Sequence, residues 1–160
     1  MLGIYLNIPN GYGCYIDQIF KSIDVSKYKW DIITDDIFGG GDIEGRHGLF
    51  FQNQESQEMP DFIDGETFKE TISVNNYYIL FADFKAYPPE SRRSKIKSLD
   101  DFMNSDCEIV FLCADCSSVV CFCKNINVLV QIHSNCEYFN FENIEPITVD
   151  EATVYGFCAF

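Results

Sequence analysis

Basic residues are scarce in this chain of 160 residues. Eleven Lys and Arg stand against 25 Asp and Glu, and the formal net charge at pH 7 is −14. Binding to phosphate backbones and to anionic lipid depends on Lys and Arg. We therefore expect no nucleic acid and no membrane surface among the partners. A basic protein or a cation is the better expectation, because opposite charge raises the rate of association; the alternative is that the charge serves only solubility.

Long apolar runs are missing as well. No stretch approaches the roughly 18 apolar residues that a membrane span needs. The first residues, MLGIYLNIPNGYG, lack the basic segment and the long apolar core of a signal peptide. We expect a cytoplasmic protein whose eight cysteines stay reduced.

Known cofactor motifs are absent from the one glycine-rich stretch, DDIFGGGDIEGRHG at 35–48. It matches neither the dinucleotide nor the P-loop glycine pattern, and its acids do not follow EF-hand spacing. No cofactor is predicted. The stretch is interpreted as a surface loop, or alternatively as the site of a small-molecule binder or enzyme in which His47 acts as a base. The residues of that candidate site are Asp35, Asp36, Asp42, Glu44, Arg46 and His47.

Hydrophobic residues make up 47% of the chain and aromatic residues 16%, enough for one domain over residues 1–160. Alternating and helical periodicities predict an α+β fold, with a mixed, mostly antiparallel sheet and two to four helices. Strands are expected at 2–8, 28–34, 48–52, 74–87, 108–114, 119–124, 141–148 and 153–160. Helices are expected at 12–23, after Asp64, at 98–104 and at 125–136.

Three polar residues are expected to cap helices: Asn10, Ser98 and Asn125. Ser98 is followed three residues later by Asp101, in the pattern of a capping box. The segment 125–136 fits a strand as well as a helix. We favour the helix because Asn125 can cap it and a strand follows at once.

Five cysteines crowd into residues 107–123, where the sequence predicts a hairpin. Cys113, Cys116, Cys121 and Cys123 form a CxxC and a CxC, and four thiolates are a possible zinc site. The other interpretation is that they are small buried apolar side chains. A redox role is disfavoured, because a hairpin turn supplies no helix dipole to lower a thiol pKa.

The register of this hairpin decides between the two interpretations. A three-residue turn at 116–118 places Cys113 opposite Cys121 on one face, which is compatible with a zinc site. A turn of two or four residues places Leu112 opposite Cys121 and sends Cys113 to the other face.

The one basic cluster is PPESRRSKIK at 88–97. It is a solvated loop, or a docking site for an acidic partner or for a second copy of the chain in a homo-oligomer.

Several short motifs resemble a small family of uncharacterised proteins from Gram-positive bacteria. They are Ile8-Pro9-Asn10, Tyr12-Gly13, Ser26-Lys27-Tyr28, Trp30, Phe102 and Ser105-Asp106-Cys107. The resemblance implies a cytoplasmic protein of one domain and brings no activity with it. From the charge, the aromatic content and the lack of a catalytic pattern, we expect a non-enzymatic protein-binding module of the inhibitor or immunity type.

Overall fold

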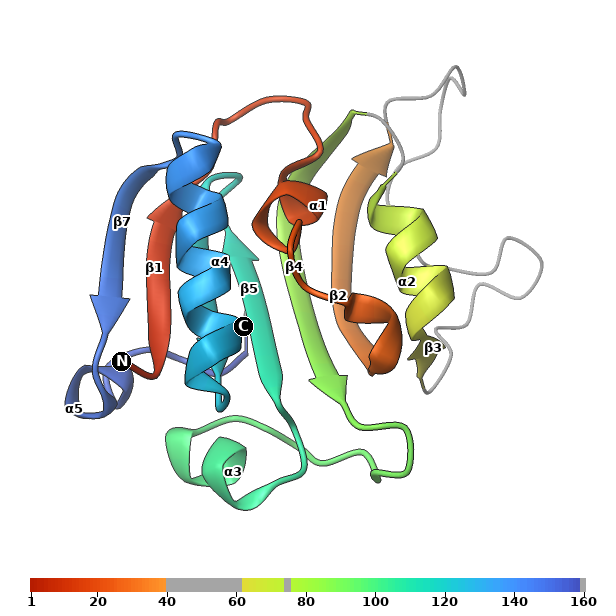
Figure 1. Cartoon of the computed structure of the whole chain (residues 1–160), viewed down its shortest axis with the longest axis vertical. Coiled ribbons are helices and arrows are strands. Elements are labelled where there is room, and N and C mark those ends of the chain that lie inside the picture. Colours follow the sequence, from red (N-terminus) through yellow and green to blue (C-terminus); the bar gives the residue numbers. More distant parts are fainter. Residues whose placement is uncertain (40–61, 74–75, 159–160) are drawn as a thin grey trace.

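A seven-stranded antiparallel sheet organises the protein (Figure 1). The structure is a computed structural model that describes residues 1–39, 62–73 and 76–158. The order across the sheet is β3-β2-β4-β5-β6-β1-β7, and every neighbouring pair is antiparallel. The strands are β1 (Gly3–Asn7), β2 (Lys29–Gly39), β3 (Ile63–Asp64), β4 (Tyr77–Tyr87), β5 (Ile109–Ala114), β6 (Ser118–Cys123) and β7 (Glu142–Ile147).

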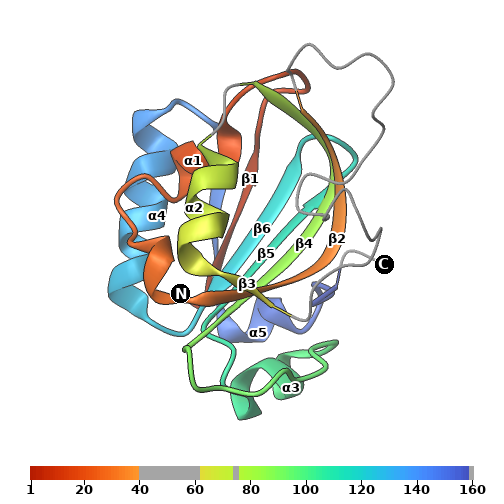
Figure 2. The same cartoon turned by 90° about the vertical axis from the view of Figure 1, so that its right-hand side faces the viewer.

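Three helices cover one face of the sheet, which we call the helix face (Figures 1 and 2). They are α1 (Tyr15–Ile19), α2 (Gly65–Ile72) and α4 (Ile126–Tyr138), and a short 3-10 turn (Val25–Lys27) links α1 to β2. The other side of the sheet is called the second face. Two further helices, α3 (Leu99–Asn104) and α5 (Val149–Ala152), lie at the lower end of the sheet in Figure 1.

The larger hydrophobic core lies between the helix face and its helices. Alternate residues of each strand point into it, because neighbouring side chains of a strand face opposite ways. Trp30 of β2 stacks on Phe68 of α2, with ring centroids 3.8 Å apart. The indole Nε1 of Trp30 donates to the carbonyl oxygen of Val25 at 3.1 Å, so this fully buried ring has a partner for its polar atom.

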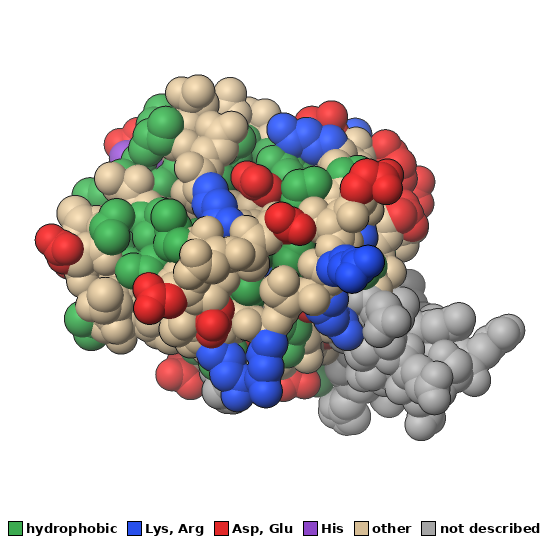
Figure 3. All heavy atoms as spheres, turned by 90° about the horizontal axis from the view of Figure 1, so that it is seen from below, with side chains coloured by type: hydrophobic (Ala, Val, Ile, Leu, Met, Phe, Trp, Pro, Cys, Tyr) green, Lys and Arg blue, Asp and Glu red, His purple; other side chains and the backbone are tan. Residues whose placement is uncertain are grey.

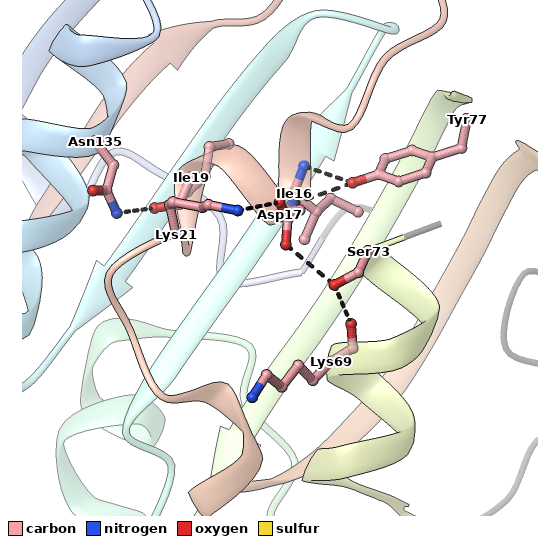
Figure 4. Close-up of polar contacts among 8 residues, drawn as sticks. All are labelled: Ile16, Asp17, Ile19, Lys21, Lys69, Ser73, Tyr77 and Asn135. Carbon is pink, nitrogen blue, oxygen red and sulfur yellow. Dashed lines mark hydrogen bonds and ion pairs between the residues drawn. The ribbon is translucent and has the colours of Figure 1, made fainter. Parts of the chain in front are cut away.

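The helix predicted over 12–23 is much shorter, because its ends are set by tertiary contacts (Figure 4). The predicted cap at Asn10 is wrong, since the N-cap is Cys14 and makes no side-chain cap hydrogen bond. The hydroxyl of Tyr77, on β4, accepts from the backbone N–H of Ile16 at 2.9 Å and of Asp17 at 3.2 Å. A strand residue therefore satisfies the open N–H groups at the start of α1.

Other local predictions are confirmed. Ser98 and Asp101 form the capping box of α3, and the Asn125 side chain accepts from the N–H of Asn127 at the start of α4. The segment after Asn125 is therefore a helix. The strand expected at 48–52 lies outside the described residues.

The α+β class is confirmed in outline, with two corrections. The described sheet is antiparallel throughout rather than mixed, and the described residues contain five α-helices rather than two to four. The strand predicted at 153–160 is wrong over the described residues 153–158. Thr148 and Glu151 instead form a capping box that starts α5 directly after β7, so the chain leaves the sheet there.

The Tyr77 hydroxyl is expected to stabilise the fold through α1. In Tyr77→Phe the N–H groups of Ile16 and Asp17 lose their acceptor, and unfolding free energy should fall by about 1–3 kcal/mol. Urea denaturation measures this loss. The control is Tyr138→Phe at a site 78% exposed, expected to change stability by less than about 0.5 kcal/mol. Equal stabilities for the two variants would contradict the capping role.

Candidate functional site

The acidic loop predicted as a binding site is only partly described. Asp35 and Asp36 belong to β2, which continues past the predicted end of the strand. Asp35 is buried and Asp36 is exposed, so these neighbours face opposite sides of the sheet. The remaining predicted residues, Asp42, Glu44, Arg46 and His47, lie outside the described residues. The binding site proposed for this loop therefore remains a prediction.

The cysteine hairpin forms as predicted, but both predicted registers are wrong. The turn covers 115–117, so that Phe111 lies opposite Cys121 and Cys113 lies opposite Val119. Cys113, Cys121 and Cys123 share the helix face and are packed in the larger core. Cys116 stands apart on the turn, where it is half-buried and has a φ of 67°.

The packing of these thiols favours the apolar interpretation. Burial raises the pKa of Cys113 to about 12 and that of Cys123 to about 11, and it raises the pKa of Cys121 well above its usual value. Zinc takes the thiolate, which burial disfavours. Within the described residues no group of three or more His, Cys, Asp or Glu side chains is placed to hold a metal ion. The zinc site remains a prediction that metal analysis of purified protein tests.

The second face carries a cluster of charged residues that the sequence pattern did not predict. Asp83 and Lys85 stand two residues apart on β4, so both point to this face. Asp31 lies opposite Lys85 in the register of β2 with β4. All three are buried, and Lys85 has no exposed surface. The Lys85 Nζ contacts Asp83 Oδ1 at 2.5 Å, which gives the buried ammonium group a counter-charge.

The basic segment 88–97 folds back over this face instead of extending into solvent. Arg93 forms an ion pair with Asp31, and the hydroxyl of Tyr87 donates to the carbonyl oxygen of Ser94 at 3.1 Å. Ile96 is buried among the apolar residues of the second face. These contacts hold the segment at both its middle and its end.

A pocket of about 560 Å³ lies between this segment and the sheet. Its lining comprises Asp31, Ile32, Ile33, Lys85, Arg93, Ser94, Lys95, Ile96, Lys97 and Cys158. Four cationic side chains and one carboxylate are thus gathered on a chain whose net charge is −14. Figure 3, seen from below, shows Lys and Arg side chains among Asp and Glu side chains at this end of the molecule.

Sequence reasoning recognised the basic segment but missed its partners on the sheet. The available signal was the pair Asp83 and Lys85 inside the strong strand pattern YYILFADFKAY, where charged residues alternate with Phe84 and Ala86. Two charges on one face of a central strand indicate a polar site on that face. The contribution of Asp31 depends on a strand register that the sequence does not encode locally.

Stability should fall at alkaline pH because of the buried thiols. An unfolded thiol loses its proton near pH 9.0, whereas buried Cys113 keeps its proton to about pH 12. Between these values the native state holds more protons than the unfolded state, so unfolding free energy decreases as pH rises. Urea denaturation from pH 9 upward measures the slope. Cys121→Ala should reduce it, whereas Cys158→Ala, at a half-buried site, should not; equal slopes for both variants would refute the assignment.

The Lys85–Asp83 pair should be required for stability. Lys85→Met leaves a buried carboxylate without its counter-charge, and we expect a loss of about 3–5 kcal/mol in unfolding free energy. The matched control is Lys21→Met, whose ion pair with Asp17 is 3.4 Å long and whose side chain is 61% exposed; there we expect less than about 1 kcal/mol. A Lys85 variant as stable as the Lys21 variant would show that the pair is dispensable.

In the described part of the chain no helix is long and apolar enough to cross a membrane. Comparison with known proteins agrees with the resemblance found in the motifs. The chain is 28% identical over 151 residues to the protein called "Uncharacterized protein YncE" of Bacillus subtilis (strain 168), and the match covers 94% of each chain. No solved structure matches the chain. A family model matches residues 1–158, and the chain belongs to that family, "Protein of unknown function (DUF2691)".

Proposed function

We propose that this chain is a non-enzymatic binding protein, and that its second-face pocket takes a small ligand in which an anionic group is joined to an apolar part. The observation that carries the proposal is the gathering of three cations with exposed side chains, Arg93, Lys95 and Lys97, around one pocket of so acidic a chain. The pocket volume of about 560 Å³ suits a small molecule.

The exposed cations of the pocket support an anionic ligand. Lys95 and Lys97 are exposed at the pocket, and the Arg93 side chain is 44% exposed although it is paired with Asp31. The guanidinium group has several N–H donors, so Arg93 can keep its bond to Asp31 and donate to a carboxylate or phosphate of the ligand. The surrounding negative surface repels anions, so binding must come from these short-range contacts.

The apolar side chains of the pocket support a ligand with an apolar part. Ile33 and Ile96 lie among its lining residues, whereas the side chain of Ile32, a third lining residue, is packed in the larger core. Ile33 is 49% exposed and occupies an irregularity in the pairing of β2 with β4. Covering this exposed surface with a hydrocarbon chain removes apolar area from water and favours binding.

Two reactive groups near the pocket, Lys85 and Cys107, are poorly placed for catalysis, which supports a binding role. The Lys85 amine has no exposed surface and is engaged by Asp83, so it cannot reach a bound molecule. Burial also raises the pKa of Cys107 to about 12, which keeps this thiol protonated and weakly nucleophilic.

The proposal also includes a cytoplasmic location and a basic protein as macromolecular partner. All eight cysteines lie in the described part of the chain and none of them forms a disulfide, which suits a reducing compartment. The net charge of −14 favours a basic partner. Capture of a basic protein from host extract at low salt, and its loss at physiological salt, would support the basic partner. Failure to find any salt-sensitive partner would refute it.

Octanoate is the probe for the pocket, because it joins a carboxylate to a short hydrocarbon chain. Titration followed by NMR should give saturable shifts in residues 93–97, whereas octanol and inorganic phosphate should each bind more weakly. Bound octanoate should also slow alkylation of Cys158, a pocket residue, and leave Cys14 and Cys116 unaffected.

Paired variants make this test specific. Lys95→Ala removes an exposed cation from the pocket and should weaken octanoate binding roughly threefold to tenfold, the loss expected for one charge-assisted contact near a surface. Arg92→Ala removes a neighbouring exposed cation that does not line the pocket and should leave affinity unchanged. Equal affinities for both variants, or no saturable binding of octanoate, would refute the proposal.

A further inference from the structure

A second cavity, of about 410 Å³, lies at the end of the sheet away from α3. It is bounded by the end of β1, the β5–β6 turn and the connection from α4 to β7. We infer that it is a separate binding site for a neutral, polyhydroxylated ligand of the size of one sugar ring. This inference does not depend on the second-face pocket, which has other residues and another charge.

The lining of this end cavity is rich in uncharged hydrogen-bonding groups. Asn7, Asn10, Asn140 and Ser117 line it, and Glu142 is its one charged residue. Neither Lys nor Arg takes part, so the cavity offers no counter-charge to an anion. A carboxamide both donates and accepts hydrogen bonds, as each hydroxyl of a sugar does, and the Glu142 carboxylate adds further acceptors.

Contacts on the sheet side hold the asparagine side chains in place before any ligand arrives. Asn7 Nδ2 donates to the hydroxyl of Tyr5 at 3.1 Å, and Asn7 Oδ1 accepts from Asn143 Nδ2 at 2.7 Å. Asn10 Oδ1 accepts from the hydroxyl of Tyr78 at 2.8 Å, which leaves the Nδ2 of Asn10 as a donor for the ligand. Preorganised groups of this kind lose little conformational entropy when a ligand binds.

The opposite side of the cavity is built by a tight turn after α4. Asn140 has a φ of 55°, a left-handed conformation that Asn tolerates better than most residues. Its N–H donates to the carbonyl oxygen of Glu137 at 3.0 Å, and the N–H of Phe141 donates to that of Cys136 at 3.1 Å. These bonds fix the backbone of Asn140 at the cavity.

Pro9, an exposed residue of the lining, supplies an apolar surface beside these amides. Phe141 also belongs to the lining, but its ring packs edge-on against Tyr15 in the larger core, with centroids 6.2 Å apart. A sugar ring presents both hydroxyl groups and an apolar C–H surface. The combination of amides with one apolar wall matches both parts, as expected of a pocket in which a few polar groups orient the ligand.

NMR titration with D-glucose and, separately, with N-acetylglucosamine tests the inference. At least one sugar should give saturable shifts of the side-chain amide signals of Asn10 and Asn140, with no shifts in residues 93–97. Octanoate should not compete, so the result stays independent of the other pocket. No saturable shift with either sugar, up to the solubility limit, would overturn the inference.

Glycine variants provide a matched pair. Asn140→Gly keeps the left-handed backbone, removes the carboxamide and should weaken sugar binding roughly twofold to tenfold, the loss of one neutral hydrogen bond. Asn76→Gly is the control, because Asn76 also has a φ of 55° but does not line the cavity. Both variants should keep the urea midpoint of the parent protein. Equal sugar affinity in the two variants would overturn the assignment of Asn140.

Discussion

The buried ammonium group of Lys85 is the constraint on which the second face depends. A charge without exposed surface needs a counter-charge, and Asp83 provides it from the same strand and the same face. Asp31 lies across from Lys85 and takes Arg93 as its own partner. The ion pair between Arg93 and Asp31 thereby holds the segment 88–97 against the sheet. The pocket exists because this segment is held by its charges in the middle and by buried Ile96 near its end.

The two sides of the sheet consequently have different roles. The helix face is closed by α1, α2 and α4 and holds the larger core, including the hairpin thiols. The second face has its own apolar cluster, in which Phe157 stacks on Phe122 at 4.2 Å, and the charged group lies beside it on β2 and β4. The end cavity depends on turns rather than on charges. One small sheet therefore presents two chemically distinct pockets, one rich in cations and one lined mainly by uncharged polar groups.

The sequence predicted the parts of this arrangement that depend on local patterns. Alternation located β1, β4 and β7, and Asn125 and Ser98 marked the starts of α4 and α3. Contacts between residues that are distant in the sequence could not be predicted from these local patterns. The Tyr77 hydroxyl caps the start of α1 from sixty residues away in sequence, and the hairpin turn lies one residue from its predicted place. The pocket needs the β2–β4 register and the return of Arg93 to Asp31, neither of which has a local signal.

A crystal structure of the protein with octanoate is the most direct test of the central claim. We predict the carboxylate at Arg93 and Lys95, the hydrocarbon chain against Ile33, and the Lys85–Asp83 contact intact beneath the ligand. Octanoate bound elsewhere on the chain, or Lys85 released from Asp83 to meet the ligand, would contradict the account.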